Sequence, residues 1–161
     1  MARILIVGCG CRGQTLAREL IAAGHSVRGT TRNPNGQNEI EATGAEVYLG
    51  DPNRVGTLIA ALDGVTIMCL LLGSARGSID DLTALHTTRL EMLLQRTIDT
   101  TVRGITYEAT GTIDQAILTA GAEKVRAKCI QSKIPYQILH NGPSSWLPTT
   151  TTAITALLAS E

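Results

Sequence analysis

Short apolar runs, rich in β-branched residues, alternate along the chain with stretches in which apolar residues recur at helical spacing. The short runs are typical of strands buried on both faces of a parallel sheet. They predict six strands, at Ile4–Val7, Ser26–Arg32, Ala45–Leu49, Val65–Leu72, Gly104–Ala109 and Tyr136–His140. The amphipathic stretches predict helices within Gln14–Ala23, Gln37–Thr43, Asn53–Leu62, Asp80–Ile98, Leu118–Ser132 and Thr149–Ala159.

Strands that alternate with helices in this way predict an open parallel sheet covered on both faces. Right-handed crossovers then give the strand order 3-2-1-4-5-6. We therefore expect one domain over residues 1–161, an α/β fold with a doubly wound six-stranded parallel sheet of Rossmann type. The Leu-rich helix at Asp80–Ile98 either covers the sheet or forms the face of a homodimer.

Composition narrows the class of protein. The chain carries 14 Lys and Arg against 14 Asp and Glu, so its formal net charge is zero and no basic surface for nucleic acid or an anionic membrane is indicated. With three Tyr, one Trp and no Phe, the core is expected to be aliphatic. The sequence shows neither a targeting segment nor a membrane span, so we expect a cytoplasmic protein.

The most informative motif follows the first predicted strand. Gly8, Gly10 and Gly13 have G-x-G-x-x-G spacing between a strand and a helix, the context of a dinucleotide-binding loop. In such a loop the first glycine permits the tight turn, the second lets the backbone approach a pyrophosphate, and the third lets the helix pack on the strand. Free N–H groups of the first helical turn favour an anion. The predicted contacts are Gly8, Gly10, Cys11, Arg12 and Gly13.

The end of the second strand indicates which cofactor is preferred. A domain that prefers NAD places an acidic residue there, about 20 residues beyond the loop. Here Thr31 and Arg32 take that place, and the first carboxylate is Glu39. An arginine pairs with the 2′-phosphate of NADP, so NADP is expected and NAD is less favoured. Arg12 is a candidate second phosphate partner, and a solvated surface arginine is the alternative at both positions.

Two further strand ends are expected to contact the cofactor. Asp51, after the third strand, either accepts a hydrogen bond from the adenine amino group or caps the helix that follows. Leu72, Gly73 and Ser74 end the fourth strand at the switch point of the sheet, where nicotinamide would lie, or they form an ordinary Gly/Ser loop.

The cysteines and histidines give weaker signals. Cys9 and Cys11 are closer together than metal-binding pairs usually are and have no second pair, so no metal site is expected. His25 and His86 are expected to be exposed. His140, at the carboxyl edge of the sheet, is a candidate contact for a substrate.

The chain resembles the extended or atypical short-chain dehydrogenase/reductase superfamily, especially its epimerase-like and NAD(P)H-sensor-like members. The resemblance lies in six segments and their order along the chain: GCGCRG, TTRNP, LGDP, LLLG, ITYEATGT and IPYQILHNGP. The resemblance implies NADP at Gly8, Gly10, Gly13, Arg32 and Asp51. The superfamily's Tyr-x-x-x-Lys is absent, and Thr110 or Thr112 stands where it has a serine after the fifth strand.

Two functions follow from these features. The first is an NADP-dependent oxidoreductase that reduces or oxidises a small carbonyl, quinone or flavin-like acceptor, with Tyr107, Thr110, Thr112 and His140 as candidate acceptor contacts. The alternative is a non-catalytic NADP(H)-binding sensor or regulatory module, which the missing Tyr-x-x-x-Lys favours.

Overall fold

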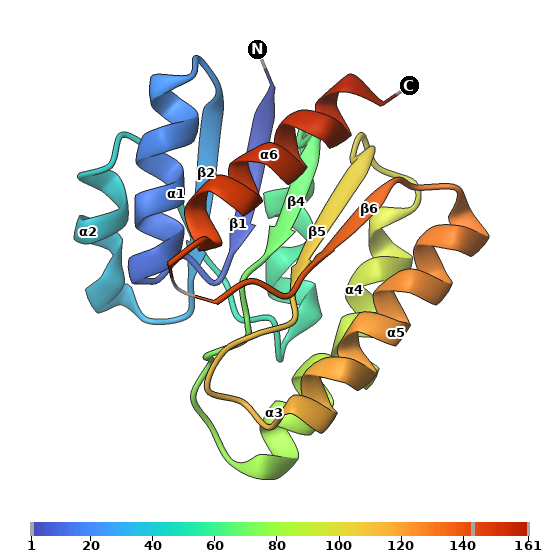
Figure 1. The fold of residues 1–161 in the computed structure, drawn as a ribbon. Coiled ribbons are helices and arrows are strands. Elements are labelled where there is room, and N and C mark those ends of the chain that lie inside the picture. The colour runs from blue at the N-terminus through green and yellow to red at the C-terminus, as the bar shows by residue number, and fades with distance from the viewer. Residues whose placement is uncertain (1, 143, 161) are drawn as a thin grey trace.

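The strands form a single parallel sheet with the order β3-β2-β1-β4-β5-β6, as the sequence predicted (Figure 1). The computed structural model describes residues 2–142 and 144–160. The strands are β1 (Arg3–Val7), β2 (Ser26–Thr31), β3 (Glu46–Leu49), β4 (Ile67–Leu70), β5 (Gly104–Glu108) and β6 (Tyr136–Leu139). Each lies within two residues of its predicted ends.

Strand β1 explains why the sheet needs two layers of helices. Its residues alternate between the two faces, so Ile4 and Ile6 pack in one core while Leu5 and Val7 pack in the other. All four side chains are buried. A strand without a polar face is stable only when both faces are covered.

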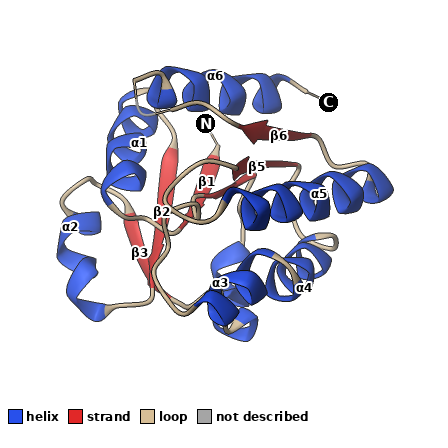
Figure 2. Ribbon diagram, turned by 60° about the horizontal axis from the view of Figure 1, so that its bottom comes forward, coloured by secondary structure: helices blue, strands red, loops and turns tan. Residues whose placement is uncertain are grey.

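Helices cover both faces of the sheet (Figure 2). Side chains of α1, α2 and α6 pack on the Ile4 face, and those of α3, α4, α5 and the 3₁₀ segment η2 pack on the Leu5 face. The helices are α1 (Cys11–Ala22), α2 (Gln37–Glu41), α3 (Ile79–His86), α4 (Thr88–Thr97), α5 (Gln115–Ser132) and α6 (Trp146–Ala159), with 3₁₀ segments η1 (Pro34–Gly36) and η2 (Val55–Leu62). No helix in the described part of the chain is long and apolar enough to cross a membrane.

Several helices differ from the prediction. The long helix expected over Asp80–Ile98 is two helices that meet at Thr87, whose φ of −127° and ψ of −90° are not helical. The helix expected over Asn53–Leu62 is 3₁₀. Helix α5 begins three residues early because Asp114 caps it, its Oδ1 accepting from the N–H of Ala116 at 2.9 Å.

His86 is buried, so the prediction of an exposed histidine was wrong. Its Nε2 lies 3.0 Å from the carbonyl oxygen of Leu72, and its Nδ1 lies 2.5 Å from Oη of Tyr107. A carbonyl only accepts, so Nε2 carries the hydrogen and Nδ1 accepts from the tyrosine hydroxyl. These two bonds turn His86 inward at the end of α3, next to the break at Thr87.

Candidate functional site

A cleft of about 970 Å³ lies at the carboxyl edge of the sheet, between the glycine loop and the loops that follow β2, β3, β4 and β5. In a doubly wound sheet, ligands bind at this edge, where the strand order reverses. The sequence-predicted residues that line the cleft are Gly8, Gly10, Cys11, Arg12, Gly13, Thr31, Arg32, Leu72, Ser74, Thr110 and Thr112. The structure thus brings together nine residues that the sequence assigned to the cofactor and two, Thr110 and Thr112, that it assigned to an acceptor.

The three glycines of the loop meet different surroundings. Gly8 has a φ of +87°, and a Cβ there would lie 2.5 Å from the carbonyl oxygen of Leu71. A Cβ at Gly13 would lie 3.2 Å from both Cys9 Sγ and Ile6 Cγ2, which agrees with close packing of α1 on β1. A Cβ at Gly10 would meet no described atom within 4 Å, so the fold itself does not require a glycine at this position.

Thr30 anchors the glycine loop to β2, a role that sequence reasoning missed. Its Oγ1 accepts from the N–H of Gly8 at 3.1 Å, and its carbonyl accepts from the N–H of Cys9 at 2.9 Å. The side chain is buried. The sequence showed only a threonine near the end of the second predicted strand, with nothing to indicate its partners.

The N-terminus of α1 has the chemistry of an anion site. Its N-cap is Gly10, no described side chain caps the first turn, and that turn contains no acidic residue. The N–H groups of this turn lie in the residues that line the cleft. Unsatisfied N–H groups at the positive end of a helix dipole fit a pyrophosphate.

Arg32 lies exposed at the end of β2 and lines the cleft. Its Nη2 donates to the backbone carbonyl of Arg76 at 2.6 Å, across the cleft in the loop after β4. Among the described residues that line the cleft, the one carboxylate is Glu108, which follows β5 rather than β2. The β2 end therefore offers a cation where an NAD site would have an acid.

Two predicted cofactor contacts lie beside the cleft rather than on its surface. Asp51 is not among the lining residues, although Gly50, Pro52 and Asn53 are. Its Oδ1 accepts from the N–H of Asn53 at 2.9 Å, which closes a turn before η2. Gly73 is also behind the surface, where a Cβ would lie only 1.9 Å from the carbonyl oxygen of Thr110.

The four candidate acceptor contacts separate into two groups. Thr110 and Thr112 line the cleft. Tyr107 is fully buried with its hydroxyl bonded to His86, so it is a core residue and has no surface for an acceptor. His140 is exposed beyond β6 and is not among the lining residues.

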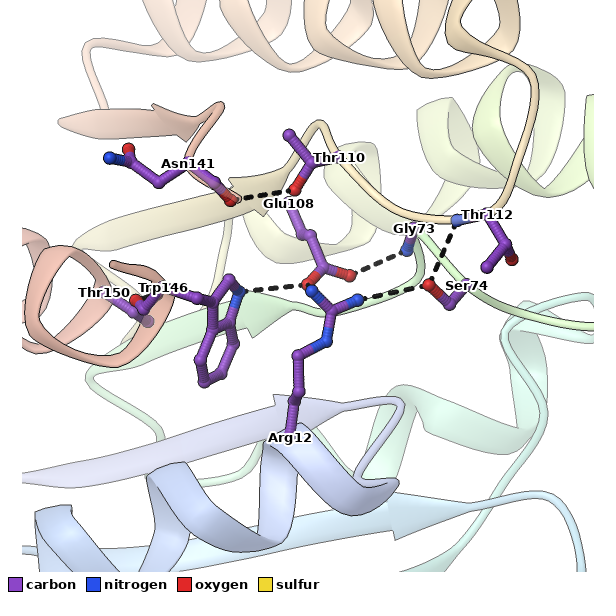
Figure 3. A network of polar contacts seen from close by, with 9 residues as sticks. All are labelled: Arg12, Gly73, Ser74, Glu108, Thr110, Thr112, Asn141, Trp146 and Thr150. Carbon is purple, nitrogen blue, oxygen red and sulfur yellow. Dashed lines mark hydrogen bonds and ion pairs between the residues drawn. The ribbon is translucent and has the colours of Figure 1, made fainter. Parts of the chain in front are cut away.

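Glu108, at the end of β5, is the centre of a polar cluster that sequence reasoning missed (Figure 3). Its Oε1 accepts from the N–H of Gly73 at 3.0 Å, and its Oε2 accepts from Trp146 Nε1 at 3.1 Å. Arg12 Nη1 also lies 3.0 Å from Oε2, and Arg12 Nη2 donates to Ser74 Oγ at 3.2 Å. A charged residue in the otherwise uncharged run GITYEA was the signal available in the sequence.

This cluster surrounds the Glu108 carboxyl group at the floor of the cleft and shifts its pKa. Burial raises the pKa of Glu108, and the Arg12 guanidinium and the N–H donors of Gly73 and Trp146 act against that rise. The Arg12 guanidinium also lies over the Trp146 ring, 5.4 Å from its centroid. Arg12 is thus engaged by Glu108 and Trp146, which the prediction of a simple phosphate partner did not include.

A doubly wound parallel sheet, a glycine loop at a helix N-terminus and a cleft at the switch point together define a dinucleotide-binding domain of Rossmann type. The chain belongs to the NAD(P)H-binding family, whose sequence profile matches residues 8–142. No match was found among curated proteins.

Solved structures with this fold include reductases and epimerases. A short-chain dehydrogenase/reductase superfamily protein from Agrobacterium tumefaciens with bound NAD is 20% identical, with a TM-score of 0.70 over 86% of this chain and 48% of that one. UDP-glucose 4-epimerase from Thermotoga maritima is 14% identical (TM-score 0.71; 86% and 54% covered). Triphenylmethane reductase from Citrobacter sp., complexed with NADP(H), is 22% identical (TM-score 0.64; 86% and 49% covered). The chain spans about half the length of these proteins.

Proposed function

We propose that the protein binds NADP(H) in the carboxyl-edge cleft and acts as an oxidoreductase on a small acceptor. The observation that supports NADP over NAD is Arg32, a cation at the end of β2 in a cleft whose one described carboxylate lies after β5. Triphenylmethane reductase, which shares the fold, was solved with NADP(H), whereas the Agrobacterium protein was solved with NAD. The preference for NADP is therefore inferred from the side chains at the cleft of this chain, above all Arg32.

Arg32 is well placed to contact a 2′-phosphate. In this fold the adenosine half lies over the strands on the β2 side of the switch point. The guanidinium of Arg32 now bonds a neutral carbonyl, that of Arg76. A dianionic phosphate is a stronger partner, because hydrogen bonds between charged groups contribute about 1.5–3 kcal/mol against about 1 kcal/mol for neutral ones.

The other half of the cleft suits a small acceptor beside the nicotinamide. Hydroxyl groups of Ser74, Thr110 and Thr112 line it together with the apolar side chains of Leu72 and Leu85. NADPH supplies the hydride, and the protein contributes binding, orientation and exclusion of water. The hydroxyls would orient the acceptor by hydrogen bonds, and the leucines would exclude water from it.

The cofactor part of the proposal is tested by titration with NADPH and NADH, followed by nicotinamide fluorescence. The wild type is expected to prefer NADPH, and Arg32→Ala to weaken NADPH about 10- to 150-fold with little change for NADH. Arg18→Ala is the matched control, because Arg18 is exposed on α1 and is not among the cleft residues. Equal weakening of both cofactors by Arg32→Ala contradicts the assignment to NADP.

A non-catalytic NADP(H) sensor is the second candidate, favoured by the burial of Tyr107 and by the absence of Tyr-x-x-x-Lys. Turnover separates the two. The oxidoreductase is expected to oxidise NADPH with at least one member of a panel of carbonyls, quinones and flavins. Tight NADPH binding without oxidation across the panel supports the sensor instead.

A further inference from the structure

We propose that Arg12 contacts the nicotinamide mononucleotide half of the bound dinucleotide, and that the buried Glu108 is the positioning residue that fixes Arg12 for this contact. The inference rests on the proposed NADP(H) binding. It concerns the polar cluster of Arg12, Ser74, Glu108 and Trp146, which the glycine motif does not explain (Figure 3).

The direction of the Arg12 side chain places its guanidinium on the nicotinamide side of the cleft. The backbone of Arg12 is in the first turn of α1, where the pyrophosphate is expected. Its terminal nitrogens contact Ser74, in the loop after β4, and Glu108, at the end of β5. Because the adenosine half lies on the β2 side of the switch point, the β4 and β5 side receives the other half.

Arg12 retains donors for a ligand. A guanidinium has five N–H groups, and the contacts of Arg12 with the other described residues use one at Nη1 and one at Nη2. The Arg12 side chain is 34% exposed and lines the cleft. It is therefore a partly desolvated cation with three donors left for oxygen atoms of a bound molecule.

Glu108 lines the cleft but offers almost no surface to a ligand. Its side chain is 2% exposed, and its two oxygens already accept from Gly73, Trp146 and Arg12. It fixes one terminal nitrogen of Arg12 while Ser74 fixes the other, so two separate segments determine the plane of the guanidinium. The carboxylate thus acts on the ligand through Arg12, which makes it a positioning residue.

A purely structural ion pair would behave differently. If the cluster only joined α1, β5 and α6, its loss would lower the stability of the fold and weaken all ligands of the cleft alike. A positioning role predicts a selective loss for ligands that contain the nicotinamide half.

The experiment compares NADPH with 2′,5′-ADP, which contains the adenosine half alone, by isothermal titration calorimetry. Arg12→Leu and Glu108→Gln are each expected to weaken NADPH about 10-fold or more, and to change 2′,5′-ADP affinity less than twofold. Glu91→Gln is the matched control, because Glu91 pairs with Lys124 at 3.2 Å on α4 and α5, and neither residue lines the cleft. Its NADPH affinity should equal that of the wild type.

A double variant tests whether Glu108 acts through Arg12. Arg12→Leu combined with Glu108→Gln is expected to bind NADPH no more weakly than Arg12→Leu alone. Additive losses, or equal losses for NADPH and 2′,5′-ADP, overturn the positioning role. Should Glu108→Gln fail to fold, Ser74→Ala removes the other anchor of Arg12 from an exposed position and must show the same selectivity. A wild type that binds neither ligand overturns the proposed function itself.

Discussion

At the scale of single residues, the glycines of the loop differ in what requires them. Gly8 is required by the protein, since its φ is +87° and a Cβ would lie 2.5 Å from the carbonyl oxygen of Leu71. A Cβ at Gly13 would lie 3.2 Å from two side-chain atoms, a tight contact that those side chains would have to relieve. Gly10 has no such neighbour within 4 Å among the described residues. In other dinucleotide sites, the glycine at this position lets the protein backbone approach the pyrophosphate of the ligand, and the same approach would explain Gly10.

Gly10→Val is therefore expected to fold normally and to lose both NADPH and NADH, because the added side chain occupies the path of the pyrophosphate. Thermal unfolding should give a melting temperature close to that of the wild type, and titration should show no saturable binding. Gly56→Val is the control, since Gly56 also has open space at its Cβ and does not line the cleft. Retained affinity in Gly10→Val contradicts the dinucleotide site.

The sequence predicted most readily the cleft residues that lie directly after a strand. The glycine spacing, Arg32 after β2 and Ser74 after β4 were readable because each position follows directly from a strand end. Glu108 was not readable, because its partners lie at positions 12, 73 and 146 and meet only in the folded chain. For the same reason Tyr107 was assigned to the site, although its hydroxyl points to His86 in the core.

At the scale of elements, the loops after β4 and β5 are locked together by direct backbone contact. A Cβ at Gly73 would lie 1.9 Å from the carbonyl oxygen of Thr110, and one at Gly111 would lie 2.1 Å from the carbonyl oxygen of Gly73. The N–H of Ile113 donates to that same carbonyl at 3.1 Å. These loops form the β4 and β5 side of the cleft as one unit.

Gly73→Ala is expected to lower the free energy of unfolding by about 1–3 kcal/mol, because the two backbones must move apart to admit a methyl group. Urea denaturation measures the change. Gly77→Ala, in the same loop, is the control, since its Cβ would lie 3.6 Å from Asp81 Cβ, an ordinary contact. A Gly73→Ala variant as stable as Gly77→Ala would show that the loops are not packed as described.

Most elements could be predicted because burial on both faces leaves a strong apolar signal in the strands. The helices were harder, because their ends depend on contacts outside the helix. The break at Thr87 comes directly after His86, whose bonds to Leu72 and Tyr107 link distant segments and leave no local pattern in the sequence. The early start of α5 follows from a cap at Asp114, outside the apolar stripe from which the helix was predicted.

At the scale of the whole molecule, the buried His86 makes stability depend on pH. Burial lowers the pKa of His86 below its ordinary value of about 6.5. Below pH ~6.5 the unfolded chain therefore binds a proton that the folded chain does not, so acid favours unfolding. The contribution of the neutral His86 imidazole to the free energy of unfolding is fully present above pH ~6.5. It is lost progressively as the pH falls towards the lowered pKa of His86.

The free energy of unfolding is accordingly expected to fall below pH ~6.5 with a slope of up to about 1.4 kcal/mol per pH unit from this group. His86→Gln retains a donor for Leu72 and an acceptor for Tyr107 but does not titrate. Urea denaturation between pH 5 and pH 8 should show this slope in the wild type and not in His86→Gln. Parallel profiles for the two proteins contradict the assignment.

The one tryptophan of the chain gives the cleft an optical consequence. Trp146 is buried, and its indole lies against Glu108 and Arg12 at the cleft floor. All tryptophan emission of the protein therefore comes from one place beside the cleft. Tryptophan emission overlaps the absorption of reduced nicotinamide, so a reduced cofactor in the cleft would quench Trp146 by energy transfer. The fluorescence of the unlabelled protein would then report whether the cleft is occupied and whether the cofactor is reduced.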